Sequence, residues 1–121
     1  MTPQTIADAY IDAWSRKDAA AIADLIAPSV TFKGPMAQTQ GAGPFMAAVG
    51  AMFALLRRID RRALFVDGDA ALAVYDFVCA EPIGACRTAE MLTIEGGKIV
   101  ASELFFDARP FEAMARARSA A

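Results

Sequence analysis

Two carboxylic acids stand out because each interrupts a strongly apolar segment in the second half of the chain. A three-residue hairpin loop at Pro82-Ile83-Gly84 would pair Glu81 with Ala85, and would therefore place Asp76 opposite Glu90 on one face of a sheet. Two carboxyls side by side in apolar surroundings cannot both ionise cheaply, so one is expected to hold a proton near neutral pH. Such a pair could give and take a proton beside a carbonyl group.

The register of this hairpin has alternatives with different consequences. A two-residue turn would place Cys79 opposite Cys86 and separate Asp76 from Glu90. We prefer the three-residue loop because Pro and Gly then occupy positions that suit their dihedral angles, and the two cysteines then lie on opposite faces without a disulfide. In a second alternative the register differs by one, and a carboxylate faces solvent or pairs with an arginine such as Arg87.

The two faces of the expected sheet are both largely apolar. A second three-residue loop at Glu95-Gly96-Gly97 would pair Ile94 with Lys98 and Glu90 with Ser102. A half-solvated antiparallel sheet normally has one polar face. We therefore expect one face to enclose a core or pocket with the helices and the other to form a homodimer. The first face would carry Val74, Asp76, Val78, Thr88, Glu90, Leu92, Ser102, Leu104 and Phe106, and the second Tyr75, Phe77, Cys79, Arg87, Met91, Glu103 and Phe105.

Aromatic and methionine residues are expected to form the wall of this pocket. Tyr10 lies one helical turn before Trp14, and its hydroxyl is either structural or a hydrogen-bond donor to a ligand. A lining of this kind favours a small hydrophobic molecule. The residues expected to contact that ligand are Trp14, Phe32, Met36, Phe45, Met52, Val74, Leu92, Ser102, Leu104 and Phe106.

The elements that would position these residues follow from capping and periodicity. Thr2 and Pro3 open an amphipathic helix of about four turns, and Asp18 caps a second helix that runs through Ile26 and is ended by Pro28. We expect a strand at 30–33, a loop at 36–43, a third helix at 45–58, strands at 63–66, 70–80, 85–95 and 98–107, and a helical tail from residue 110. Helices followed by a meander of strands predict an α+β fold, with three N-terminal helices packed on a curved, mostly antiparallel sheet.

Composition narrows the functional classes. The chain has 121 residues and is 56% hydrophobic and 21% charged, so residues 1–121 are expected to form a single domain. A formal charge of −2 argues against a nucleic-acid partner, and the lack of histidine excludes imidazole bases and histidine-bound zinc. Without a signal-peptide pattern or a membrane-spanning segment, we expect a cytoplasmic protein that does not bind membranes. No metal or cofactor is expected.

Two weaker patterns could indicate the binding of phosphate-containing ligands. The run from Arg57 to Arg62 could bind phosphate or coenzyme A, but a solvated helix end is the preferred interpretation. Gly41-Ala42-Gly43 begins like a dinucleotide loop, yet it lacks the third glycine and the parallel strand–loop–helix unit, so nucleotide binding is not predicted.

Short motifs run through the chain in a fixed order, namely Tyr10…Ala13-Trp14…Asp18, Val30-Thr31-Phe32, the Gly41 loop, Ala89-Glu90-Met91-Leu92, Glu95-Gly96-Gly97-Lys98-Ile99-Val100 and Phe105-Phe106-Asp107. They resemble the nuclear transport factor 2-like superfamily, and most of all its SnoaL-like polyketide cyclase, ketosteroid isomerase and limonene epoxide hydrolase branches. The resemblance covers nearly the whole chain. It implies a cystatin-like, cone-shaped α+β barrel with a deep apolar pocket, dimeric through the sheet.

The resemblance also assigns residues, although the catalytic residues of ketosteroid isomerase and of limonene epoxide hydrolase are both incomplete in this sequence. Tyr10 matches the tyrosine that donates to the oxyanion in ketosteroid isomerases, and Glu90 matches its protonated acidic partner, whereas the catalytic base would fall on Gly34. Asp76 matches one acid of limonene epoxide hydrolase, but Val74 and Leu104 replace its arginine and its second aspartate.

Three hypotheses follow. The first is a cofactor-independent enzyme of isomerase, cyclase or hydrolase type, in which Asp76 and Glu90 exchange protons and Tyr10 stabilises an oxyanion on a small carbonyl or epoxide compound. The second is a binding protein whose carboxyls only orient a hydrophobic ligand. The third is a dimerisation module with a filled barrel.

Overall fold

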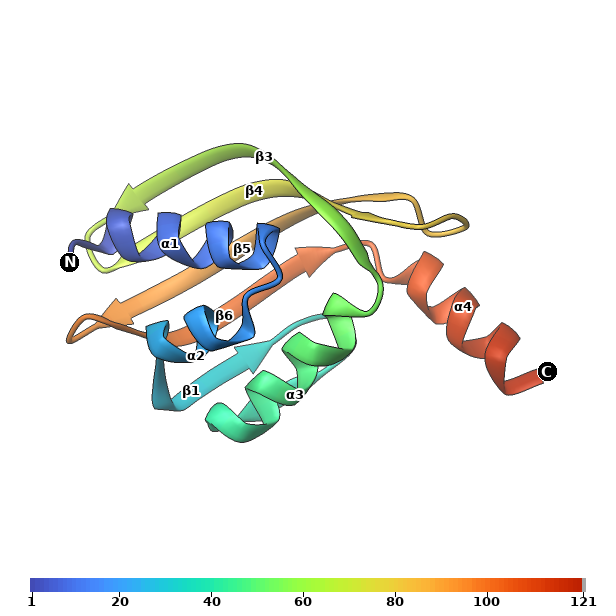
Figure 1. Cartoon of the computed structure of the whole chain (residues 1–121), viewed down its shortest axis with the longest axis horizontal. Coiled ribbons are helices and arrows are strands. Elements are labelled where there is room, and N and C mark those ends of the chain that lie inside the picture. The colour runs from blue at the N-terminus through green and yellow to red at the C-terminus, as the bar shows by residue number, and fades with distance from the viewer. Residues whose placement is uncertain (121) are drawn as a thin grey trace.

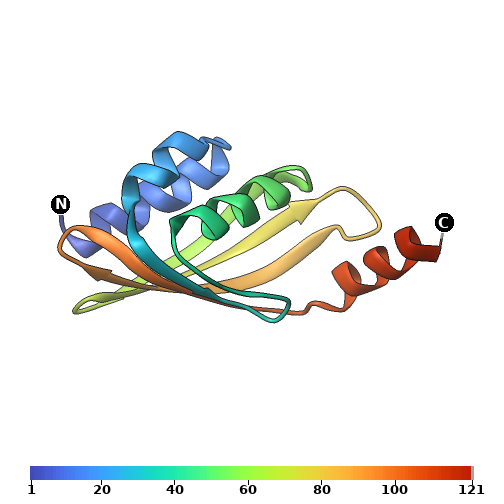
Figure 2. The ribbon, with the colours of Figure 1, turned by 90° about the horizontal axis from the view of Figure 1, so that it is seen from below.

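The computed structural model describes residues 1–120 and contains a curved sheet with helices on one face (Figure 1). Seen from below, one face of the sheet is covered and the other is bare (Figure 2). The strand order is β2-β1-β6-β5-β4-β3, with β1 and β6 parallel and all other neighbours antiparallel. This confirms the cone-shaped α+β fold, although the sheet does not close. The elements are α1 (Pro3–Ser15), α2 (Ala19–Leu25), β1 (Ile26–Lys33), β2 (Gln38–Gln40), α3 (Ala42–Phe53), β3 (Leu56–Asp67), β4 (Ala70–Cys79), β5 (Ala85–Glu95), β6 (Lys98–Phe106) and α4 (Arg109–Ala120).

The predicted starts of the first two helices are confirmed. The Thr2 side chain accepts a hydrogen bond from the Thr5 N–H, and Pro3 occupies the first turn of α1. The Asp18 carboxylate accepts the Ala21 N–H at 3.0 Å and caps α2. Each cap satisfies a backbone donor that the first helical turn leaves without a partner.

Several predicted boundaries are wrong, because pairing with neighbouring strands overrides local preference. Helix α2 ends at Leu25, and Pro28 lies inside β1 instead of ending a helix. Helix α3 ends at Phe53, and the arginines from Arg57 to Arg62 lie in β3, where Leu56 pairs with Cys79 of β4. The expected helix end with dipole-compensating cations is therefore an extended edge strand.

The register between β4 and β5 differs from the prediction by three residues. Val78 pairs with Ala85, and the Cys79 N–H donates to the Gly84 carbonyl, so residues 80–84 form a longer connection than expected. This loop buries Ile83, which is 9% exposed, and the burial of an apolar side chain favours the longer connection. An odd shift turns every side chain of β4 to the other face.

The faces of β4 are therefore reversed relative to the prediction. Tyr75 and Phe77 face the helices, while Val74, Asp76 and Val78 belong to the opposite face. Cys79 and Cys86 share the helix-facing side, contrary to the expectation, and both are buried free thiols.

Strands β5 and β6 keep the predicted faces despite a different register. Gly96 and Gly97 form a two-residue turn with φ of 58° and 77°, and a register shift lies before it in β5, between Thr93 and Ile94. Glu90 pairs with Leu104 instead of Ser102, which is a shift of two residues. An even shift preserves the side on which every residue lies.

The core lies between the curved sheet and the first three helices. Its buried residues include Ile6, Tyr10 and Ala13 from one side of α1, together with Leu92 and Ile99 from the sheet. In residues 1–120, every helix is too short or too polar to cross a bilayer.

Candidate functional site

The Glu90 carboxyl is the centre of a buried polar cluster. Glu90 is 2% exposed, and three hydroxyls from three other elements donate hydrogen bonds to it. The Tyr75 hydroxyl reaches Oε1 at 2.8 Å, while the Tyr10 and Ser102 hydroxyls reach Oε2 at 2.9 Å and 2.6 Å. Helix α1 and strands β4 and β6 thus meet at one carboxyl of β5.

Local sequence explains how these groups converge. Tyr10 lies on the buried stripe of α1, four residues after Ile6, so its side chain points at the sheet. Tyr75 and Ser102 come from the two strands that flank β5, on the helix-facing side. The four residues therefore lie on rigid elements, which hold their hydroxyl and carboxyl groups in a fixed geometry.

The electrostatics of the cluster are dominated by burial. Desolvation raises the pKa of Glu90 above its usual range, and the hydrogen bonds from Ser102, Tyr75 and Tyr10 oppose this shift by stabilising the carboxylate. Burial, followed by the negative charge of Glu90, raises the pKa of both tyrosines well above the ordinary value. The tyrosines therefore stay protonated, and Glu90 is the group in this cluster whose pKa is raised from the acidic range.

A cavity of about 60 Å³ adjoins the cluster. Its polar lining consists of Tyr10, Tyr75, Thr88 and Glu90, and most of the remaining surface is apolar and aromatic. Six residues predicted to contact a ligand do line it, namely Trp14, Phe32, Phe45, Met52, Leu104 and Phe106. The other lining residues are Ala48, Val49, Phe77, Cys86 and Phe111.

Four predicted ligand contacts lie elsewhere. Met36 is 50% exposed in the turn before β2, and Val74 is on the opposite face of the sheet because the β4 register differs from the prediction. Leu92 is completely buried in the core and does not reach the cavity. Ser102 stands behind Glu90 and contacts its carboxylate instead of the cavity.

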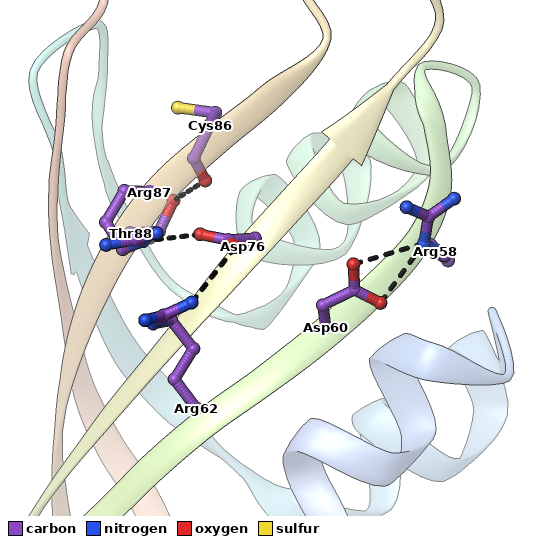
Figure 3. A network of polar contacts seen from close by, with 7 residues as sticks. All are labelled: Arg58, Asp60, Arg62, Asp76, Cys86, Arg87 and Thr88. Carbon is purple, nitrogen blue, oxygen red and sulfur yellow. Dashed lines mark hydrogen bonds and ion pairs between the residues drawn. The ribbon is translucent and has the colours of Figure 1, made fainter.

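Asp76 is separated from Glu90 by the sheet itself. Its carboxylate accepts a hydrogen bond from the Arg87 guanidinium at 2.6 Å and lies 3.6 Å from the Arg62 guanidinium (Figure 3). The hydrogen bond from Arg87 lowers the pKa of Asp76 and keeps it ionised. The predicted adjacency of Asp76 and Glu90, with a shared proton, is therefore wrong. The alternative in which one carboxylate pairs with Arg87 matches the structure.

Tyr75 is the main site residue that the sequence analysis missed. With the shorter hairpin loop it was placed on the opposite face, whereas the longer loop turns it toward Glu90. A hydroxyl two residues before Phe77, in a strand whose other residues are apolar except Asp76, is the signal that could have indicated it. Thr88 was placed on the correct face but not named as a ligand contact.

The Trp14 indole N–H is a further polar group of the cavity wall. It is buried, and no acceptor within residues 1–120 meets hydrogen-bond geometry with it. It still lies close enough to the Tyr10 hydroxyl to favour the phenolate slightly, against the larger effects that raise the pKa of Tyr10. A donor in this position is available to an oxygen atom of a ligand.

A metal centre is not indicated. In the part of the chain that the structure describes, His, Cys, Asp and Glu side chains form no group of three or more that could hold an ion.

The sequence of residues 7–102 matches the SnoaL-like domain. The chain belongs to the SnoaL-like family. This SnoaL-like protein has no match among curated proteins.

Solved structures support the same fold. A protein from Kribbella flavida DSM 17836 is 28% identical over 97% of this chain and 96% of its own, with a TM-score of 0.87. A candidate polyketide cyclase from Sinorhizobium meliloti is 24% identical over 87% of this chain and 100% of its own, with a TM-score of 0.76. An NTF2-like protein of unknown function from Cytophaga hutchinsonii is 20% identical over 93% and 96%, with a TM-score of 0.80.

Proposed function

We propose that this SnoaL-like protein is a cofactor-independent enzyme that moves a proton on a small, apolar carbonyl compound. The observation that carries the proposal is a single buried carboxyl, held by three hydroxyls, at the polar end of an apolar cavity. A carboxyl whose pKa is raised by burial is suited to proton transfer near neutral pH.

The proposed chemistry follows from counting the protons of the cluster. When Glu90 is ionised, all three hydroxyls donate to it. When Glu90 takes a proton from the carbon next to a carbonyl, its own O–H becomes a donor. One tyrosine hydroxyl is then free to turn its hydrogen toward the oxygen of the enolate. That tyrosine, Tyr10 or Tyr75, would stabilise the enolate oxygen, and Glu90 would return the proton to another carbon atom of the substrate.

The lining also restricts the substrate class. Glu90 is the charged group of the cavity wall within residues 1–120, and no lysine or arginine contributes to that wall. An anionic ligand would meet the negative charge of Glu90 without a counter-ion. We therefore propose a neutral ligand that presents one oxygen to the hydroxyls and an apolar body to the aromatic residues.

The test is the isomerisation of cyclohex-3-enone to the conjugated cyclohex-2-enone, followed by ultraviolet absorbance. We expect Glu90→Gln to lower kcat/KM by about 100-fold or more, which is the usual contribution of a positioned acid or base. Asp76→Asn is the matched control, because it removes a carboxylate from the opposite face, and it should retain the activity of the wild type. Equal activity of Glu90→Gln and the wild type would contradict the proposal.

A second candidate is a binding protein without catalysis. The observation that favours it is that hydroxyls of the chain itself donate to both oxygens of Glu90. In that case, cyclohex-2-enone would raise the melting temperature of the wild type and of Glu90→Gln alike, and neither protein would isomerise cyclohex-3-enone.

We also propose a homodimer through the uncovered face of the sheet. One row across this face is Phe65, Leu72, Met91 and Glu103, and the apolar side chains Phe65 and Met91 are 62% and 39% exposed. Arg87 lies on the same face, four residues before Met91. Arg87 and Glu103 give this face charges of both signs, which a surface that pairs with a second copy of itself can use.

A further inference from the structure

Helix α4 contributes a wall of the cavity although it is weakly attached to the rest of the molecule. Phe111 lines the cavity, is 4% exposed, and meets Phe106 of β6 edge-to-face with the ring centroids 5.5 Å apart. One turn later, Met114 packs partly against the core, and the residues from 115 to 120 are exposed. Figures 1 and 2 show α4 running beyond the sheet, away from the other helices.

The junction between β6 and α4 is two residues long. It consists of Asp107 and Ala108, and the Asp107 carboxylate accepts the N–H of Arg109, the first residue of α4, at 3.0 Å. The hydrogen bonds from Arg109 lower the pKa of Asp107 to about 2, so this contact persists at neutral pH. An open groove of about 480 Å³ runs beside α4, lined by Pro82 and by Pro110, Met114 and Arg118 of the helix, so there is space into which the helix can move.

The cavity is small for the ligand class proposed above. Its volume of about 60 Å³ is less than that of a cavity that holds benzene, about 150 Å³. Known ligand pockets have volumes of roughly 300 Å³ or more. A larger compound therefore requires a wall to move. The walls from β4, β5 and β6 are held by ladder hydrogen bonds, and the walls from α1 and α3 are held by the core, whereas α4 is held mainly by Phe111 and Met114.

We propose that Phe111 sets the size limit of the pocket and that α4 is its gate: a ligand larger than the cavity displaces the Phe111 ring, and α4 swings toward the groove to admit it. This inference rests on the proposed function only in that both require the cavity to take a ligand. It concerns size and access, whereas the proposed function concerns proton transfer by Glu90.

The experiment uses Trp14, the single tryptophan of the chain, as a reporter inside the cavity. Quenching by acrylamide measures access to the cavity without a bound ligand, and stopped-flow quenching by cyclopentanone and by the larger 2-tetralone measures entry. Phe111→Ala removes the gating ring, and Met114→Ala weakens the attachment of α4 while keeping the ring. Arg116→Ala, an exposed change on the same helix, is the matched control.

We expect Phe111→Ala to increase the acrylamide quenching constant of Trp14 at least threefold and the affinity for 2-tetralone at least tenfold, with a smaller increase for cyclopentanone, which exceeds the cavity by less. Met114→Ala should accelerate the entry of 2-tetralone several-fold, and Arg116→Ala should match the wild type. An unchanged entry rate in Met114→Ala would overturn the gate, because Phe111 would then be a fixed wall. Equal ketone affinities and acrylamide quenching in Phe111→Ala and the wild type would overturn the size limit.

The outcomes also separate this inference from the proposed function. If Glu90→Gln abolishes isomerisation while Phe111→Ala changes neither access nor size preference, the gate fails and the enzyme proposal stands. If Phe111→Ala widens access as expected while no variant isomerises cyclohex-3-enone, the enzyme proposal fails and the gate stands.

Discussion

Glu90 is buried with three donors arranged around its two oxygens. A buried carboxylate is costly unless hydrogen bonds replace the water it loses, and here Tyr10, Tyr75 and Ser102 supply them. The pKa of Glu90 is nevertheless raised, so desolvation outweighs the three hydrogen bonds. The residue is thereby able to exist in either charge state with partners on both oxygens.

The raised pKa of Glu90 predicts a pH-dependent contribution to stability. Below its unfolded pKa, about 4.5, the acid is neutral in both states. As the pH rises from there through the raised folded pKa, the unfolded chain releases the proton first, so the folded state is progressively destabilised. The free energy of unfolding of the wild type relative to Glu90→Gln should fall over this range by about 1.4 kcal/mol per unit of pKa elevation.

Urea denaturation at intervals from pH 4 to pH 8 measures this difference. Asp76→Asn is the control, and its difference from the wild type should stay constant over this range, because the lowered pKa of Asp76 gives stability that is fully present above its unfolded value of 3.8. A constant difference between the wild type and Glu90→Gln across the whole range would contradict the raised pKa.

Tyr75 and Tyr10 differ in how well the Glu90 carboxylate remains hydrogen-bonded after the hydroxyl of each is removed. Tyr75 is the donor to Oε1, whereas Tyr10 shares Oε2 with Ser102. Tyr75→Phe therefore leaves a buried carboxylate oxygen without a partner and should cost about 1–3 kcal/mol of stability, while Tyr10→Phe should cost about 0.5–1.5 kcal/mol. Chemical denaturation at pH 7 measures both. A larger loss in Tyr10→Phe would show that Ser102 does not satisfy Oε2 alone.

At the scale of elements, the sequence predicted which helices and strands form better than it predicted how the strands pair. The caps at Thr2 and Asp18 are local, and so they could be read from the chain. The β4–β5 register depends on whether Ile83 is buried, which is a tertiary contact that turn preferences do not contain. Because the register shifted by an odd number, Asp76 left the site and Tyr75 entered it, whereas Glu90 stayed.

A Gly→Ala substitution is predicted to have opposite effects at two glycines, Gly84 in the loop that sets this register and Gly50 inside α3. Gly84 has φ of +66°, and a Cβ there would lie 3.0 Å from the Glu81 carboxylate, so Gly84→Ala should destabilise the protein by about 1–2 kcal/mol. Gly50 lies inside α3 with no atom within 4 Å of an added Cβ, so Gly50→Ala should stabilise it by about 0.5–1 kcal/mol. Thermal denaturation compares the two, and a stabilised Gly84→Ala would contradict the loop conformation.

At the scale of the whole molecule, one face of the sheet builds the site and the other is left uncovered. The order of helices and strands predicted helices packed on one face of the sheet, and the outward-facing residues of β5 and β6, which include Arg87, Met91, Glu103 and Phe105, are those that the sequence placed on the other face. The uncovered face nevertheless carries more charge than expected, since Asp76 lies there with Arg62 and Arg87 (Figure 3). Aromatic residues, Met and Arg are enriched in protein interfaces, and Phe65, Met91 and Arg87 on this face are of these types.

The proposed homodimer can be broken by one charge on the uncovered face. Met91 is 39% exposed in the middle of that face, and Met91→Glu should lower the dimer affinity by at least tenfold, because a carboxylate would be buried between two copies without a partner. Met36→Glu is the matched control, since Met36 is 50% exposed in the turn before β2, away from this face. Sedimentation velocity from 1 to 100 µM measures both variants. A wild type that remains monomeric throughout, or dissociation caused equally by both substitutions, would rule out association through this face.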